Sequence, residues 1–153
     1  MDLRRRAVYL SRMIESPTVV LDTNVLEAAF RSRRGASFAI LSLVGTGRFE
    51  IAVSVSLLLE YEEVLLRHAG KPERTEASIR DVLDYLCSAG KRQAIFFRWR
   101  ATLPDPSDDM VLELAVAAGC DAIVTHNLRH FPGVQRFGVR VLRPAEFLDE
   151  IGD

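Results

Sequence analysis

The sequence has few cysteines, a net charge near zero and no long apolar run, and each of these features argues against a class of protein. Its two cysteines, Cys87 and Cys120, lie far apart in apolar surroundings, which favours a reduced, cytoplasmic compartment over a disulfide-stabilised secreted domain. No apolar run approaches the length of a membrane span, so we expect no membrane partner. The formal net charge is −1, so any contact with nucleic acid would need a local basic patch.

A glycine-rich loop is also missing after the first apolar run, Thr18–Leu21, which argues against an ordinary nucleotide-binding domain. Residues 1–16 are basic but lack the continuous apolar centre of a signal peptide. We expect them to form an N-terminal extension, helical or flexible, with Met13 as an alternative start. One domain is expected over residues 17–153, because a chain of this length buries about two-thirds of the surface that it exposes when unfolded.

Short apolar runs alternate with helical patterns along the chain. Thr18–Leu21 follows Pro17 and has the uninterrupted character of a strand buried on both faces. Further strands are expected at 50–54, 94–97, 121–125 and, at an edge, 139–142, and helices at 25–32, 36–44, 57–68, 73–89, 108–118 and 145–151. The expected N-caps are Thr23 or Asn24, Ser56 and Ser107. The alternation predicts a three-layer α/β fold with a central, mostly parallel sheet and helices on both faces.

Acidic side chains gather where the predicted strands end or the helices begin. Asp22 directly follows the first strand, at the edge where open α/β sheets bind their ligands. Asp105, Asp108 and Asp109 lie around the start of the helix that leads to the strand at 121–125. Each acid also has an ordinary structural explanation, because turns and helix starts favour aspartate whatever the function.

Two glutamates are further candidates for the same edge of the sheet. Glu60 lies on the helix after the second strand, where helical periodicity alone does not distinguish it from Glu62. Glu113 lies one turn after Asp109 on the same helix face. Clustered carboxylates repel one another unless a cation neutralises them. Oxygen ligands suit Mg²⁺ or Mn²⁺, which can activate water and stabilise the leaving oxygen of a phosphodiester.

Four motifs, in this order and spacing, resemble the PIN domain. They are Asp22-Thr23-Asn24 after a buried strand, Ser56-x3-Glu60-Tyr61 opening a helix, Asp105-Pro106-Ser107-Asp108-Asp109, and Val124-Thr125-His126-Asn127. The segment from Thr125 to Pro132 further resembles the PIN toxins of bacterial and archaeal toxin–antitoxin pairs. The similarity extends over roughly residues 18–148.

This resemblance implies a metal-dependent endoribonuclease with a PIN-like, Rossmann-like fold, in which Asp22, Glu60 and Asp109 are catalytic and hold Mg²⁺ or Mn²⁺. Asp109 is preferred to Asp108 because it precedes Asn127 by 18 residues, the separation typical of the family's late acids. Many members have a fourth acid where this chain has Asn127. Further candidate ligands are Asp105, Asp108 and Asn127, and the expected supporting residues are Thr23, Asn24, Glu113 and Thr125.

As a toxin, the chain would cleave RNA in the cytoplasm, bind a cognate antitoxin and form a homodimer. Its arginine cluster near the expected site is a candidate RNA contact, although a solvated loop explains the cluster equally well. The candidate RNA-binding residues are Arg31, Arg33, Arg34, His126 and Arg129. The alternative function is a PIN-like module that binds RNA or protein without cutting, for which Asn127 in place of the fourth acid is the argument.

Overall fold

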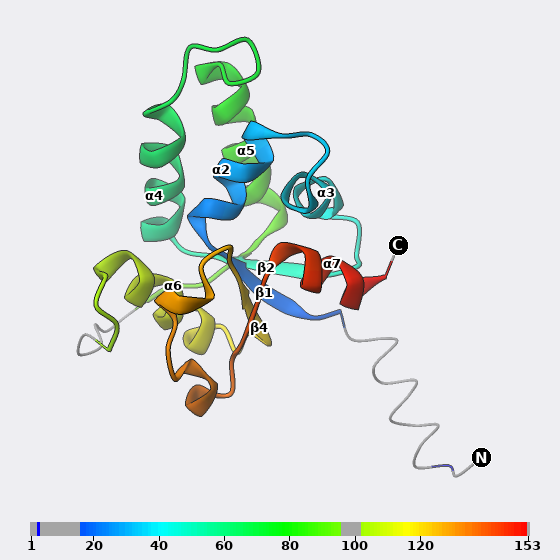
Figure 1. Ribbon diagram of the computed structural model, residues 1–153, viewed down its shortest axis with the longest axis vertical. Helices are drawn as coiled ribbons and strands as arrows, with labels where there is room; N and C mark the ends of the chain where they lie inside the picture. Colours follow the sequence, from blue (N-terminus) through cyan, green and yellow to red (C-terminus); the bar gives the residue numbers. More distant parts are fainter. Residues whose placement is uncertain (1–2, 4–15, 96–101, 153) are drawn as a thin grey trace.

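The computed structural model describes residue 3, residues 16–95 and residues 102–152. The centre of the molecule is a parallel five-stranded sheet in the order β3-β2-β1-β4-β5 (Figure 1). Its strands are β1 (Thr18–Leu21), β2 (Glu50–Val53), β3 (Lys91–Arg92), β4 (Ala122–Val124) and β5 (Arg140–Leu142). The expected parallel α/β architecture is confirmed. The division between an extension and a domain at residue 16 stays a prediction.

Helices cover both faces of this sheet. They are α2 (Thr23–Arg31), α3 (Ala36–Leu43), α4 (Val55–Leu66), α5 (Glu76–Ala89), α6 (Pro106–Ala117) and α7 (Pro144–Ile151), with short 3-10 helices η1 (Leu128–His130) and η2 (Val134–Phe137). In Figure 1, α2 to α5 stand above the sheet and α6 lies below it. Among the described residues, no helix has the length and apolarity that crossing a membrane requires.

β1 is the central strand, and all four of its residues are buried. Val19, Val20 and Leu21 are at most 1% exposed, which follows from the helices on both faces of a parallel sheet. The strand pairs with β2 on one side and with β4 on the other, where Leu21 lies opposite Val124. The chain segments that follow β1 and β4 therefore leave the sheet side by side, at the edge where the sequence placed Asp22.

The structure corrects three predicted helix starts. α2, α4 and α6 each begin two residues earlier than the sequence pattern indicated. Their N-caps are Asp22, Ser54 and Asp105 instead of Thr23 or Asn24, Ser56 and Ser107. Each observed cap accepts a hydrogen bond from a main-chain N–H of the first turn, at 2.9 to 3.1 Å. The pattern missed these starts because more than one residue with a capping oxygen lies near the start of each helix, and the prediction chose a later one.

Two other predicted boundaries also change. α5 begins at Glu76, after a cap at Thr75, rather than at Glu73. The predicted strand at 94–97 is wrong at 94–95, which lie outside any strand, and residues 96–97 lie outside the described residues. The strand at this sheet edge is instead β3, whose exposed residues pair with Ala52 and Val53 of β2 through main-chain atoms. β3 therefore has no apolar pattern that could reveal it.

Candidate functional site

Asp22 lies at the carboxyl end of β1 and is the N-cap of α2. Its side chain is 8% exposed. The Oδ1 atom accepts the main-chain N–H of Thr23 at 2.9 Å, and Oδ2 accepts the Thr125 hydroxyl at 2.8 Å and the Asn24 amide at 3.3 Å. Burial raises the pKa of Asp22 above its ordinary value, although the hydrogen bonds from Thr125 and Thr23 oppose that rise. The site thus holds a carboxylate that water solvates poorly.

The segment after β4 is tied to Asp22 by a small hydrogen-bond network. Thr125 is fully buried, and its hydroxyl oxygen also accepts the Asn24 amide at 3.1 Å and the main-chain N–H of Asn127 at 3.0 Å. The Asn24 carbonyl accepts the main-chain N–H of His126 at 3.1 Å. The supporting positions predicted at Thr23, Asn24 and Thr125 therefore all contact Asp22, and the network fixes the direction of its carboxylate.

Ser37 is a member of this site that the sequence reasoning missed. It lies on α3, is 3% exposed, and its hydroxyl is 2.8 Å from Nε2 of His126. Burial lowers the pKa of His126, and the positive charge of Arg31 lowers it further, while Asp22 acts in the opposite direction. No sequence signal pointed to Ser37, because a serine within an apolar helix has no distinguishing motif.

Asp108 is the second buried carboxylate of the site. It is 7% exposed. Burial raises its pKa to about 6, and the negative charge of Asp22 is the next cause, followed by that of Asp105. Nδ1 of His130 lies 3.5 Å from Oδ2 of Asp108, and His130 lowers the pKa of both Asp108 and Asp22. Two buried carboxylates that repel each other therefore share one neighbourhood, with a histidine beside them.

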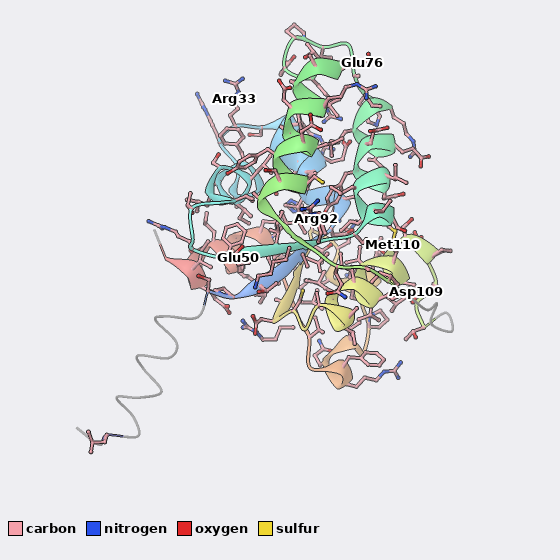
Figure 2. The ribbon with its side chains drawn as sticks, turned by 180° about the vertical axis from the view of Figure 1, so that it is seen from behind. Arg33, Glu50, Glu76, Arg92, Asp109 and Met110 are labelled. Carbon is pink, nitrogen blue, oxygen red and sulfur yellow. The ribbon has the colours of Figure 1, made fainter. Side chains whose placement is uncertain are left out.

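Asp109, labelled on α6 in Figure 2, has different partners. Its Oδ1 atom accepts the main-chain N–H groups of Thr102 and Leu103, at 3.1 and 2.8 Å. Successive helical residues point about 100° apart, so Asp108 and Asp109 cannot face the same way. The structure brings Asp108 to Asp22 and directs the Asp109 carboxylate to the loop before α6.

The remaining predicted acids make no hydrogen bond to the Asp22 network in the described part of the chain. Glu60 is half-buried on α4, and its carboxylate makes no hydrogen bond or ion pair with the described residues. Its neighbour Tyr61 is buried and donates its hydroxyl to the Leu21 carbonyl, beside Asp22. Oε1 of Glu113 is buried and lacks a hydrogen-bond partner in the described part of the chain. Asp105, exposed at the start of α6, contributes its charge to the fields at Asp22 and Asp108.

The predicted RNA-binding arginines are exposed. Arg31 ends α2, and its Nη2 atom lies 3.5 Å from Oε2 of Glu27. Arg33 and Arg34 lie in the loop that follows, and Figure 2 shows Arg33 projecting away from the molecule. Arg129 is exposed in η1. Arg31 is the member of this cluster whose charge reaches the site, through its effect on His126.

The sequence matches the PIN domain over residues 18–129. This chain belongs to the PIN domain family. Two solved structures with a similar fold are VapBC2 from Rickettsia felis bound to a DNA fragment from their promoter, and FitAB bound to an IR36 DNA fragment. The first has a TM-score of 0.52 and 17% identity, covering 82% of this chain and 98% of that one. The second has a TM-score of 0.57 and 16% identity, covering 82% and 94%. No curated protein matches the sequence.

PIN domains are generally metal-dependent nucleases, and the donor chemistry here suits a hard divalent ion. Nowhere in residues 16–95 and 102–152 do three His, Cys, Asp or Glu side chains group as a complete set of metal ligands. Mg²⁺ does not need such a set, because it commonly binds through one or two carboxylates, several waters and a substrate phosphate. Asp22 and Asp108 supply two buried carboxylates, and burial raises the pKa of each. The residues present therefore fit the ion.

Proposed function

We propose that this PIN domain is a metal-dependent endoribonuclease. The observation that carries the proposal is the pair of buried, mutually repelling carboxylates, Asp22 and Asp108, at the carboxyl edge of the sheet. Burying two negative charges together is unfavourable unless a cation joins them. The repulsion between the two carboxylates costs stability in the unliganded protein, which supports a functional reason for the arrangement.

We assign the ion to Asp22 and Asp108, with Asp105, Glu60 and Asn127 as further ligands from the predicted set. We assign Asp109 the role of a positioning residue, because its Oδ1 atom accepts the main-chain N–H groups of Thr102 and Leu103. Either Mg²⁺ or Mn²⁺ suits the oxygen donors.

The protein's own groups would orient the ligands and the substrate. The Thr125 hydroxyl and the Asn24 amide hold Oδ2 of Asp22 in one direction, as hydrogen-bonding neighbours of metal ligands commonly do. His130 partly compensates the charge of Asp108. When bound, the ion would act as a Lewis acid that makes water a stronger nucleophile and offsets the charge developing on the phosphodiester. No side chain is required as a covalent nucleophile.

We further infer that the chain is the toxin of a toxin–antitoxin pair. The resemblance of Thr125 to Pro132 to such toxins supports this, as does the shared fold with VapBC2 and FitAB. A cognate antitoxin, an RNA substrate and a homodimer are the partners that follow. Co-purification with the product of the neighbouring gene tests the first, and light scattering after size-exclusion chromatography tests the last.

The direct test is cleavage of single-stranded RNA by the purified chain. Cleavage is expected with Mg²⁺ or Mn²⁺ and not with EDTA. Asp22→Asn and Asp108→Asn are each expected to lower the rate by more than about 100-fold, since each removes a ligand charge. Asp84→Asn is the matched control, because Asp84 is exposed on α5. Equal activity of all three variants would refute the assigned site.

A second candidate is a PIN domain that binds RNA or protein without cutting. Asn127 in place of an acid favours it, as does the lack of a three-residue ligand group within the described ranges. Calorimetric titration with Mn²⁺ separates the two. Binding that Asp22→Asn removes favours the nuclease, whereas no binding at millimolar Mn²⁺ favours the non-cutting module.

A further inference from the structure

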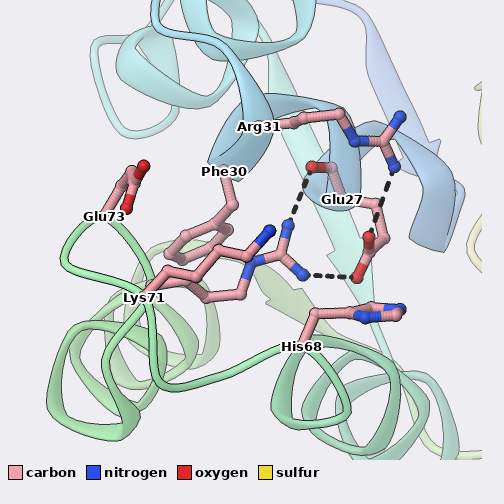
Figure 3. Close-up of a pocket in the computed structure, with 7 residues that line it drawn as sticks. Glu27, Phe30, Arg31, His68, Lys71 and Glu73 are labelled. Carbon is pink, nitrogen blue, oxygen red and sulfur yellow. Dashed lines mark hydrogen bonds and ion pairs between the residues drawn. The ribbon is translucent and has the colours of Figure 1, made fainter.

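A pocket of about 290 Å³ lies away from Asp22 and Asp108. It is formed between the end of α2, the end of α4 and the loop that leads to α5 (Figure 3). The pocket is built around a buried ion pair. Arg74 is 6% exposed, its Nη1 atom lies 3.0 Å from Oε1 of Glu27, and its Nη2 atom donates to the Glu27 main-chain carbonyl at 3.3 Å. The guanidinium also lies 5.6 Å from the centre of the Phe30 ring. These contacts hold the Arg74 guanidinium in place at the base of the pocket.

Positive charge exceeds negative charge in this pocket. Arg31 and Arg74 both contact the Glu27 carboxylate, at 3.5 and 3.0 Å, so one acid serves two guanidinium groups. Lys71 adds a third cation, and Glu73 is the second acid of the lining. Three permanent cations against two carboxylates give the lining a net charge of +1 with His68 uncounted, although the whole chain carries −1.

Two groups at the mouth have no side-chain partner. The Lys71 ammonium and the His68 ring make no hydrogen bond or ion pair with the described residues. Figure 3 shows Lys71 reaching past the Phe30 ring and His68 facing the pocket from the end of α4. An unpaired ammonium beside two guanidinium groups that share one acid favours an anion over a neutral ligand.

The pocket and the carboxylate site lie on the same helix. α2 follows its N-cap Asp22 and ends at Arg31, a length of about 13 Å at 1.5 Å per residue. The field of Arg31 reaches His126, next to the Asp22 network. A chain with regularly spaced anions could therefore contact both places at once.

We propose that this basic pocket binds a backbone phosphate of single-stranded RNA, at a position removed from the phosphate that is cleaved. Lys71 and Arg31 contact this phosphate, and Arg74 is a positioning residue because Glu27 already occupies its donors. The inference rests on the proposed nuclease function, since it takes the RNA to be the same strand that Asp22 and Asp108 process. It gives the enzyme a second anchoring point that short substrates cannot reach.

The test measures RNA affinity in a full-length, cleavage-deficient Asp22→Asn protein by fluorescence anisotropy over a range of KCl concentrations. Lys71→Gln is expected to weaken binding of an oligoribonucleotide of about 12 nucleotides by roughly three- to tenfold. It should also lower the slope of log affinity against log salt by about 0.7, the value for one lost phosphate contact on a single strand. Affinity for a dinucleotide should not change. Lys91→Gln, an exposed lysine on β3, is the matched control and should behave as the parent.

Three outcomes would overturn the pocket assignment: an unchanged affinity in Lys71→Gln, an equal loss in Lys91→Gln, or the absence of any RNA binding. If Lys71→Gln instead weakens capture of a protein partner while RNA affinity stays the same, the pocket serves that partner and the assignment is also wrong. If only the nuclease proposal is wrong, the result is distinguishable. RNA binding would then still depend on Lys71, but the parent protein would not cleave RNA in Mg²⁺ or Mn²⁺.

Discussion

At the scale of single residues, Asp22 uses its two carboxylate oxygens for different tasks. Oδ1 caps α2, and Oδ2 accepts hydrogen bonds from Thr125 and Asn24. Asparagine caps helices about as well as aspartate, so Asp22→Asn keeps the start of α2 while removing the charge. Replacement by alanine would lose both functions, and a loss of activity could then reflect a weakened helix.

Asp108 gives the protein a pH dependence that can be measured without metal. Its pKa in the folded protein, about 6, exceeds the ordinary 3.8, so folding favours the protonated form. The stability contributed by that form is complete below pH 3.8 and is lost as the pH rises through about 6. Asp108→Asn stays neutral throughout. The Tm of this variant minus that of the parent, measured by calorimetry in EDTA, should therefore increase as the pH rises from about 4 to 7. A difference in Tm that does not depend on pH would contradict the assignment.

Substitution of Asp109 should lower stability more than cleavage, whereas substitution of Asp108 should mainly lower cleavage. Asp109→Ala removes the acceptor for two main-chain N–H groups and is expected to lower the free energy of unfolding by about 1–3 kcal/mol. Cleavage per folded molecule should fall much less than in Asp108→Asn. Urea denaturation and an RNA cleavage assay on both variants make the comparison. Loss of all cleavage in a folded Asp109→Ala protein would return Asp109 to the ligand set.

From the sequence, Asp109 was preferred to Asp108 by its spacing from Asn127. The sequence predicted acids around the start of α6, and the structure brings Asp22, Asp105 and Asp108 into one electrostatic group. The choice between Asp108 and Asp109 depends on how α6 is rotated against the sheet. The residues that fix that rotation are spread along α6, so spacing from Asn127 does not determine it.

At the scale of elements, the observed N-caps can be tested against the predicted ones. Ser54→Ala is expected to lower the free energy of unfolding by about 0.5–2 kcal/mol, because the Ser54 hydroxyl oxygen accepts the N–H of Leu57 in a buried position. Ser56→Ala removes the same hydroxyl from an exposed residue inside α4 and should change stability little. Urea denaturation midpoints give the comparison. An equal effect of both substitutions would contradict the assigned cap.

Apolar runs were sufficient to predict four of the five strands, because β1, β2 and β4 bury side chains and β5 half-buries Val141 and Leu142. β3 was missed for a physical reason. Lys91 and Arg92 are exposed and join the sheet through main-chain pairing with Ala52 and Val53. Main-chain pairing of this kind depends on the position of the chain after the end of α5, which the pattern of apolar side chains does not predict.

At the scale of the whole molecule, the site joins two distant parts of the chain. Asp22 and Thr125 meet because β1 and β4 are neighbours in the sheet, and this meeting was predictable from a parallel order of strands. The basic pocket was not predictable, since Glu27 and Arg74 are 47 residues apart and no strand pairing brings them together. Their contact depends on the path of the loop between α4 and α5.

Metal binding should be visible in the stability of the intact protein. A ligand that binds only the folded state adds about 2.7 kcal/mol when its concentration is 100 times its Kd. Mn²⁺ is therefore expected to raise the Tm of the parent protein and to have little effect on Asp22→Asn. Asp84→Asn should respond as the parent does. A shift of equal size in all three proteins would show that the ion binds elsewhere.

The bond between the Thr125 hydroxyl and Asp22 has a consequence for synthesis on the ribosome. A nascent chain that has reached Ala89 already contains Asp22, β1 and β2, but neither Asp108 nor the threonine that orients the first carboxylate. If the chain cleaves RNA as proposed, we expect truncated translation products ending before β4 to leave the messenger RNA being read intact. Under the proposed function, the completed polypeptide would acquire nuclease activity only at the end of its own production.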